Sequence, residues 1–289
     1  MTHSTTSISE VTGTLYIVAT PIGNQKDITR RAVEILESVD WVAAEDTRHT
    51  RPLLQNLGIN QTLISLHEHN EKSRSEQLLE KLRNGENGAL VSDAGTPLIN
   101  DPGYFLVKLL RESGVDVVPI PGPSAVITAL CAAGLPTDRF SYEGFLPAKS
   151  NKRLAVLATL VEDVRTLVFY ESPHRVVASL ADFETAFGAE REMVVARELT
   201  KKFEQFVSGT IAEINAYFTE NSDKVRGEFV FMVSGAEEKE VVELSTMDDL
   251  ILTLLKQRLP VKQISEIVAD YAGIKKKPIY NRVLELKED

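Results

Sequence analysis

Short apolar runs alternate with helix-like segments along most of this chain, and that alternation limits its fold more than any other feature. Leu15–Ala19 is a continuous apolar run that ends at Thr20 and Pro21, as a fully buried strand would. Residues 28–39 follow with apolar positions at helical spacing, and the pattern then repeats. Repetition of this kind predicts an α/β fold in which helices cover the sheets.

The expected elements form two series. The first has strands at residues 15–19, 41–44, 62–66, 89–92 and 115–120, and helices at 28–39, 50–57, 73–82, 102–112 and 123–133. The second has strands at 166–170, 193–197 and 228–233, and helices at 152–160, 173–187 and 211–218. A capping box from Ser73 to Glu76 is expected at the start of one helix. Turn-rich residues 136–147 separate the two series and predict a domain boundary.

The series and their boundaries predict several domains. They are an N-terminal tail (1–13), an α/β domain (14–135), a second α/β domain (136–235), a charged linker (236–245) and a helical unit (246–289). The helical unit has three short helical patterns, with Gly273 before a basic third one. This arrangement resembles a helix-turn-helix, and a plain three-helix cap fits it equally well.

Charge and composition exclude several classes of protein. The net charge is −10, so bulk charge does not indicate a nucleic-acid binder, although residues 246–289 carry eight Lys or Arg against seven Asp or Glu. The single cysteine, Cys131, excludes a disulfide framework and a cysteine-ligated zinc site, and it fits a reducing cytoplasm. We expect no membrane span and no secretory signal, because no apolar run approaches about 18 residues and the start of the chain is polar.

Two polar, glycine-containing segments follow predicted strands. Residues 92–103 carry Asp93, Thr96 and Asp101, and Gly95 would let the backbone approach a ligand closely. Residues 119–125 form a second such loop at the end of the next strand. Ligands bind at the carboxyl ends of strands in open α/β sheets, so the two loops predict one shared pocket. The alternative for the first loop is an Asx turn with a helix cap by Asp101.

Other motifs are weaker or absent. The turn after the first strand has one glycine where a dinucleotide-binding turn needs three, and no Walker A motif occurs. His67-Glu68-His69 lacks the helical spacing and the third ligand of a zinc site, so we expect no metal. His49 and His174 follow predicted strands and could face the same cleft, or lie in solvated, salt-bridged loops.

The ordered motifs resemble those of the tetrapyrrole methylase superfamily, and more narrowly its ribosomal RNA branch. The resemblance covers the chain from about Gly13 to its end and rests on eight blocks taken together. The blocks are Thr20–Asn24, Glu45–Arg48, Ser92–Pro97, Pro121–Ala125, Glu143–Pro147, Phe169–Arg175, Arg197–Lys202 and Gly227–Val230.

This resemblance implies a fold and an activity. The fold would be two α/β domains of the tetrapyrrole methylase type, with S-adenosylmethionine in the cleft between them and a small C-terminal helical unit. The activity would be methylation of the ribose 2′-oxygen of a cytidine, cytidine 1402, in 16S rRNA of the small ribosomal subunit. A cytoplasmic homodimer without metal is also implied.

The resemblance also implies roles for individual residues. The expected cofactor contacts are Pro21, Asp93, Gly95, Thr96, Ser124, Ala125, Leu146, Leu199, Gly227 and Glu228. The expected RNA contacts are basic residues at cleft edges and in the tail, namely Arg48, His49, Arg51, Lys152, Arg153, His174, Arg175, Lys275, Lys276 and Lys277. Among residues that could activate the acceptor hydroxyl (Glu45, Asp46, His49, Glu171, His174 and Lys201), Glu171 and Lys201 are the preferred catalytic candidates.

Two other functions fit the sequence. One is methylation of a tetrapyrrole precursor, whose carboxylates would also suit a basic pocket. The other is an RNA-binding or assembly factor that keeps the cofactor pocket without catalysis. The lysines of the C-terminal unit favour RNA over a small substrate, and cofactor turnover would exclude a non-catalytic factor.

Overall fold

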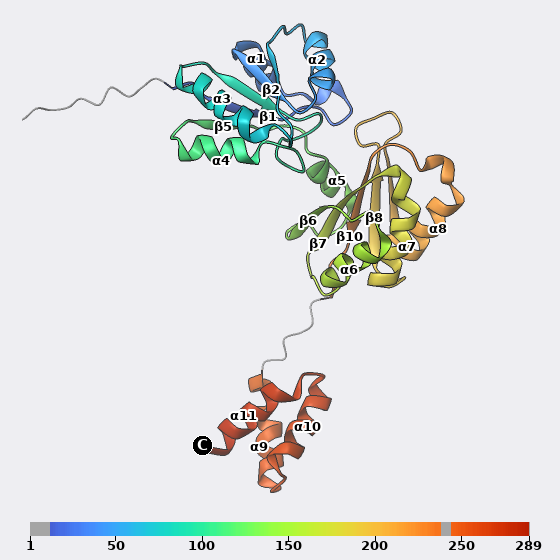
Figure 1. Ribbon diagram of the computed structural model, residues 1–289. Coiled ribbons are helices and arrows are strands. Elements are labelled where there is room, and N and C mark those ends of the chain that lie inside the picture. Colours follow the sequence, from blue (N-terminus) through green and yellow to red (C-terminus); the bar gives the residue numbers. More distant parts are fainter. Residues whose placement is uncertain (1–11, 238–243, 289) are drawn as a thin grey trace, which may run out of the picture. The chain divides into compact units, whose positions relative to one another are not determined.

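The computed structural model describes residues 12–237 and 244–288 (Figure 1). The chain divides into two compact units, Met1–Ala236 and Glu237–Asp289, and both sheets belong to the first. The predicted fold class, two α/β regions of this type followed by a helical unit, is confirmed. Most of the predicted tail (1–13) and linker (236–245) lies outside the described residues, and the predicted boundary at 136 falls inside the first unit.

The first sheet is parallel and lies between two layers of helices. Its strands, in spatial order, are β3 (Leu63–Ser65), β2 (Trp41–Ala44), β4 (Gly88–Val91), β1 (Leu15–Val18) and β5 (Val117–Ile120). Its helices are α1 (Arg30–Ser38), α2 (Thr47–Asn56), α3 (Glu71–Arg83) and α4 (Tyr104–Glu112). Buried side chains of α1 and α2 pack on one face, and those of α3 and α4 pack on the other. This burial on both faces explains why the strands are continuously apolar.

The second sheet is mixed, and it also has helices on both faces (Figure 1). Its strands, in spatial order, are β6 (Phe140–Phe145), β7 (Thr166–Glu171), β10 (Phe229–Val233), β8 (Glu192–Arg197) and β9 (Gln205–Thr210), and only the β6–β7 pair is parallel. One face packs against α6 (Ser150–Leu160), α7 (Val176–Phe187) and α8 (Ile211–Glu220). The other face packs against α5 (Ala125–Ala133), which links the two sheets within the first unit.

Three details differ from the sequence prediction. Strands β6 and β9 were not expected, since both are edge strands with polar positions, and Gly144 follows a register shift in β6. The capping box is wrong, because α3 begins at Glu71 and Ser73 therefore lies inside its first turn. Asp101 does not cap α4, whose N-cap is Gly103 and whose first amides bond to Glu71.

The second unit contains η4 (Leu244–Met247), α9 (Asp248–Lys256), α10 (Val261–Ala272) and α11 (Lys276–Glu288). The helices share an apolar core, and Arg282 of α11 forms a 2.6 Å ion pair with Asp248 of α9. Gly273 ends α10 in the left-handed conformation (φ +64°), which glycine adopts without strain, and lets the chain turn into α11. None of the helices in the described ranges is long and apolar enough to cross a membrane.

Candidate functional site

The site lies where the first sheet changes its direction of winding. Neighbouring strands β1 and β4 lead into α1 and α4, which pack on opposite faces of the sheet. The chain therefore parts at the carboxyl ends of these strands and leaves a crevice, the usual ligand position in such sheets. Thr20 and Gly95 hold the two strand-end loops together through reciprocal backbone hydrogen bonds of 2.9 and 3.0 Å.

A cavity of about 320 Å³ opens at this crevice, and residues from both sheets line it. Six of the predicted cofactor residues are among them: Asp93, Gly95, Thr96, Ser124, Ala125 and Glu228. The volume is at the lower end of the range typical of pockets for drug-sized ligands, roughly 300–1,000 Å³. The structure thus brings the two loops singled out in the sequence to one cavity.

The other predicted cofactor residues lie around this cavity without lining it. Pro21 lines a smaller neighbouring hollow, and Leu146 and Leu199 are buried in the core. Gly227 has φ +84°, and a Cβ atom there would lie 2.0 Å from Oε1 of Glu198, so no other residue fits without rearrangement. Leu199 belongs to the same core cluster as the cavity residues Ile22 and Val230 and so supports the wall of the cavity.

Several cavity residues escaped the sequence reasoning as individual positions. They are Ile22, Ala94, Ile99, Asn100, Phe145, Tyr170, Phe229 and Val230. The cavity is also lined by Asp101, which was expected in the first loop, and by Glu171, which was expected in a different role. Asn100 is a non-glycine residue with positive φ (68°), as is Leu98 (72°), and such strain is concentrated at functional sites. The side-chain amide of Asn100 donates to the hydroxyl of Tyr142 at 2.8 Å, which joins this loop to β6. Most of these residues fall inside the sequence blocks that carried the resemblance.

The cavity has an acidic side. Burial raises the pKa of Asp101 to about 6, a shift that a hydrogen bond with Ser92 opposes and the charge of Asp93 supports. Burial also raises the pKa of Glu45, and the charges of Asp101 and Asp93 add to that effect. Crowded carboxylates of this kind favour a bound cation, because a cation relieves their mutual repulsion.

Glu171 is not available as a general base, which corrects the first catalytic assignment. Its side chain is 1% exposed and forms a 2.6 Å ion pair with Arg175. The same carboxylate accepts hydrogen bonds from the Ser172 amide (2.7 Å) and the Ser179 hydroxyl (2.5 Å). Both of its oxygens are therefore already bonded within the second sheet region, so Glu171 shapes the cavity wall.

Lys201 is a cation in this structure. Its Nζ lies 3.0 Å from Glu198 and 3.1 Å from the cavity residue Glu228. Burial disfavours the charged ammonium, but the hydrogen bonds and charges of these two carboxylates outweigh it and raise the pKa of Lys201. Lys201 can thus contribute positive charge beside the cavity, but it cannot take up a proton near neutral pH.

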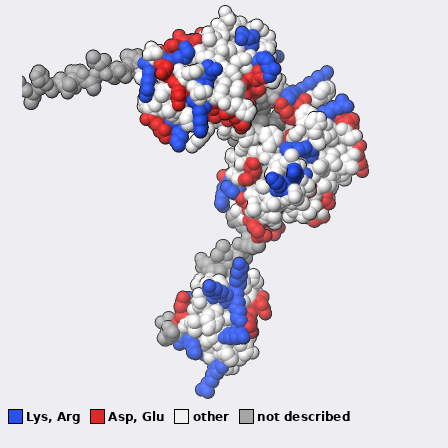
Figure 2. Space-filling model, viewed as in Figure 1, with Lys and Arg blue, Asp and Glu red and all other residues white. Residues whose placement is uncertain are grey.

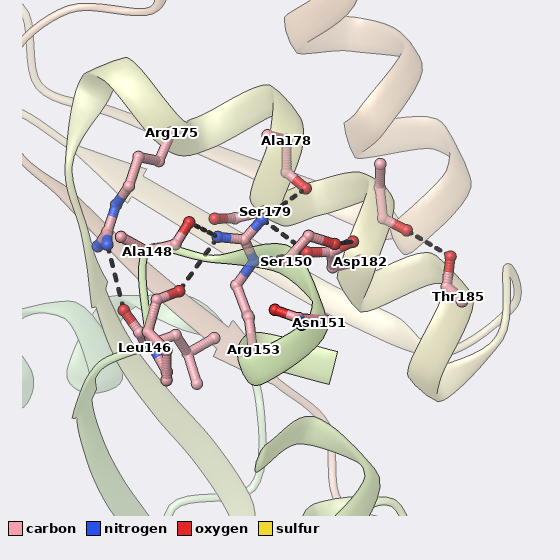
Figure 3. Close-up of polar contacts among 12 residues, drawn as sticks. Leu146, Ala148, Ser150, Asn151, Arg153, Arg175, Ala178, Ser179, Asp182 and Thr185 are labelled. Carbon is pink, nitrogen blue, oxygen red and sulfur yellow. Dashed lines mark hydrogen bonds and ion pairs between the residues drawn. The ribbon is translucent and has the colours of Figure 1, made fainter. Parts of the chain in front are cut away.

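Arg153 lies in a buried polar network, which corrects its assignment as an RNA contact. Its side chain is 3% exposed and forms a 2.6 Å ion pair with Asp182, between α6 and α7 (Figure 3). Its guanidinium also donates to the carbonyls of Pro147, Ala148 and Ala178. Arg175 donates to the carbonyl of Leu146 at 3.2 Å, so the two arginines hold residues 146–148, directly after the cavity residue Phe145, in place.

The remaining predicted RNA contacts differ in their availability. Arg48, Arg51, Lys152 and His174 are exposed, although Arg48 is paired with Asp46. His49 is also exposed, and its Nδ1 lies 2.8 Å from Oδ2 of Asp93. In the second unit, Lys275 and Lys277 are exposed, Lys276 is paired with Glu266, and Lys and Arg side chains gather on the visible face (Figure 2). Among the residues that the structure describes, no group of three or more potential ligands could hold a metal ion.

Comparison with known proteins identifies the family to which these features correspond. The family model described as Tetrapyrrole (Corrin/Porphyrin) Methylases matches residues 14–215, and the one described as RsmI C-terminal HTH domain matches residues 244–287. The chain is 49% identical to the ribosomal RNA small subunit methyltransferase I of Pasteurella multocida, over 96% of this chain and 99% of that one. It is 53% identical to the protein of the same name from Escherichia coli O157:H7, over 94% and 95% of the two chains.

Solved structures show the same fold at low sequence identity. The methyltransferase CobJ has a TM-score of 0.58 and 17% identity, over 79% of this chain and 97% of its own. A uroporphyrin-III C-methyltransferase from Thermus thermophilus, solved with S-adenosylhomocysteine, has a TM-score of 0.52 and 18% identity over 77% and 97% of the chains. The family resemblance found in the ordered motifs is confirmed by these matches.

Proposed function

This chain belongs to the ribosomal RNA small subunit methyltransferase I family of tetrapyrrole methylases, and from that premise we propose its reaction. It transfers a methyl group from S-adenosylmethionine to the ribose 2′-oxygen of a cytidine, cytidine 1402, in 16S rRNA of the small ribosomal subunit. The observation that carries the proposal is the near-full-length similarity to relatives named for that subunit's RNA. The cavity at the switch point of the first sheet supports it.

The cavity suits S-adenosylmethionine in shape and charge. Ile22, Phe145 and Val230 supply apolar surface for an adenosine group. Ser124, the N-cap of α5, uses no side chain to cap the helix, so amides of the first turn can bond to a carboxylate. Asp93, Asp101 and Glu228 supply negative charge, which favours a ligand that carries a sulfonium and an ammonium group.

The residues of the chain have two tasks in this reaction. The sulfonium supplies a methyl carbon that is already activated for an in-line displacement. The protein therefore has to align the acceptor hydroxyl and exclude water. The apolar wall around Phe145 contributes to both tasks. The positive charge of Lys201, next to Glu228, lies where it can favour the developing alkoxide.

We expect the pKa of Asp101 to make cofactor affinity depend on pH. A cationic ligand binds more tightly to the ionised carboxylate, so affinity for S-adenosylmethionine should rise with pH through about 6 and then level off. S-adenosylhomocysteine lacks the sulfonium charge and should show a smaller rise. Calorimetric titration of both ligands from about pH 5 to about pH 7.5 measures the difference, and Asp101→Asn should remove it. Equal pH dependence for both ligands would contradict this role.

The reaction itself can be tested with labelled S-adenosylmethionine and three acceptors. These are small ribosomal subunits that lack the modification, naked 16S rRNA and a tetrapyrrole precursor. We expect label on one cytidine ribose, located by nuclease digestion and mass spectrometry, with assembled subunits better than naked RNA because structured RNA is recognised largely by shape. Label on the tetrapyrrole alone would replace this proposal with the small-molecule alternative.

We also propose how the RNA and the protein assemble. The exposed basic residues Arg51, Lys152, Lys275 and Lys277 supply phosphate contacts, so affinity for the subunit should fall with salt. The enzyme acts in the cytoplasm as a homodimer, as the family resemblance implies. Light scattering after size-exclusion chromatography gives the mass of the particle, and a value near 32.0 kDa would contradict the dimer.

A further inference from the structure

A second hollow, of about 150 Å³, adjoins the cofactor cavity. Pro21, Gly23 and Gln25 from the loop after β1 form part of it, and His49, Thr50 and Leu53 of α2 form another part, with Ser92 and Asp93 completing it. We call it the acceptor hollow. The cofactor contacts proposed above leave this hollow without a ligand.

The acceptor hollow and the cofactor cavity share their walls. Pro21 and Gly23 line the hollow, whereas Ile22 between them lines the cavity. Likewise, Ser92 lines the hollow, Ala94 lines the cavity, and Asp93 lines both. A nucleotide seated in the hollow would thus be next to the cofactor across a shared wall, and in-line transfer needs the reacting atoms about 3–3.5 Å apart.

The hollow contains a histidine that a carboxylate holds in place. Nδ1 of His49 lies 2.8 Å from Oδ2 of Asp93, and the other oxygen of Asp93 accepts the Asp46 amide at 3.1 Å. Because an ionised carboxylate can only accept, Nδ1 carries the hydrogen, and in the neutral ring Nε2 then has a lone pair. This is the arrangement by which an aspartate fixes the tautomer and the orientation of a catalytic imidazole.

The other candidates for a base are excluded or less well placed. The Glu171 carboxylate is bonded at both oxygens, and Lys201 stays protonated between two carboxylates. Asp46 caps α2 and is chelated by Arg48, which lowers the pKa of Asp46 to about 2, so it is a poor proton acceptor. The exposed His174 and Glu45, whose pKa is raised by burial, line neither of the two cavities.

We propose that His49, positioned by Asp93, is the general base that removes the proton from the acceptor 2′-hydroxyl of a nucleotide bound in the acceptor hollow. This assignment rests on the proposed function. The hydroxyl oxygen forms its bond to the methyl carbon as the carbon–sulfur bond breaks, and that electron pair stays on sulfur. The hydroxyl proton passes to Nε2 of His49 and from there to solvent, so the products are the methylated ribose, S-adenosylhomocysteine and a proton.

The charges around His49 determine its expected titration. The hydrogen bond to Asp93 raises the pKa of His49. The charge of Asp46 adds to this effect, and the charge of Arg48 opposes it. The base must be neutral to act, so kcat should rise with pH through a value above the ordinary histidine pKa of about 6.5 and then level off.

The test compares His49→Gln with His69→Gln, a matched change of another exposed histidine in the same unit, which lines neither cavity. On small subunits we expect His49→Gln to lower kcat by about 10²-fold or more and to lose the rise with pH, while His69→Gln behaves as wild type. Affinity for S-adenosylhomocysteine and thermal stability should be unchanged in both variants, because His49 is exposed. Added imidazole should partly restore the activity of His49→Ala, which a merely structural role would not allow.

Two unfavourable results can be told apart. If wild type labels a ribose and His49→Gln keeps both its turnover and its pH profile, only the assignment of His49 is overturned. If wild type labels no ribose on any acceptor, the proposed function fails and His49 loses its role with it.

Discussion

Arg153→Ala should lower the free energy of unfolding by about 3–5 kcal/mol, the usual result of removing one partner from a buried ion pair. The substitution would leave the Asp182 carboxylate, whose side chain is 12% exposed, without its cation. It would also release the carbonyls of Pro147 and Ala148 and thereby loosen the chain beside the cofactor cavity. Denaturant titration followed by far-ultraviolet circular dichroism measures the loss.

Lys152→Ala is the matched control for this prediction, because Lys152 is the neighbouring exposed residue on α6. Its effect on stability should stay within about 0.5 kcal/mol, while its affinity for the small subunit falls. The double variant Arg153→Met with Asp182→Leu should be more stable than Arg153→Ala, since it leaves no unpaired buried charge. An Arg153→Ala protein as stable as Lys152→Ala would contradict the buried network.

Ala125→Phe should abolish the cofactor site without unfolding the protein. Ala125 is the first residue of α5 and lines the cavity, so a phenyl ring there would occupy space that the ligand needs. We expect affinity for S-adenosylhomocysteine to fall by 100-fold or more, about 2.8 kcal/mol, as measured by calorimetry.

Ile127→Phe provides the comparison on the same helix, because Ile127 is 55% exposed and does not line the cavity. Its affinity for S-adenosylhomocysteine should equal that of wild type. Both variants should have a thermal transition close to that of the parent protein. Wild-type affinity in Ala125→Phe would mean that the cofactor binds elsewhere.

The sequence predicted strands best where both faces of the sheet are covered. Strands β2 and β4 at the centre of the first sheet are buried at every position, so each stands out as a short apolar run in the sequence. The edge strands β6 and β9 were missed, because an edge strand has fewer neighbours and tolerates polar residues such as those of Gln205–Thr210.

The assignments of Glu171 as a base and of Arg153 as an RNA contact were wrong for a different reason. Their burial cannot be read from the sequence, where each looks like a charged surface residue. Arg153 pairs with the distant Asp182, and Glu171 pairs with the nearby Arg175, but only the folded chain shows that both are buried. Asp182 lies 29 positions after Arg153, and the contact between His49 and Asp93 spans 44 positions. No local pattern in the chain encodes such pairs.

The sequence by itself thus determined the fold class, the family and two of the loops that line the cavity, because strand periodicity, ordered motifs and glycine-containing strand ends are all visible along the chain. The tertiary structure alone decided which titratable groups are free to react. Their availability depends on burial and on the partners that folding brings together. The Glu171 carboxylate is bonded at both oxygens, burial raises the pKa of Asp101, and the Asp93 carboxylate orients an imidazole.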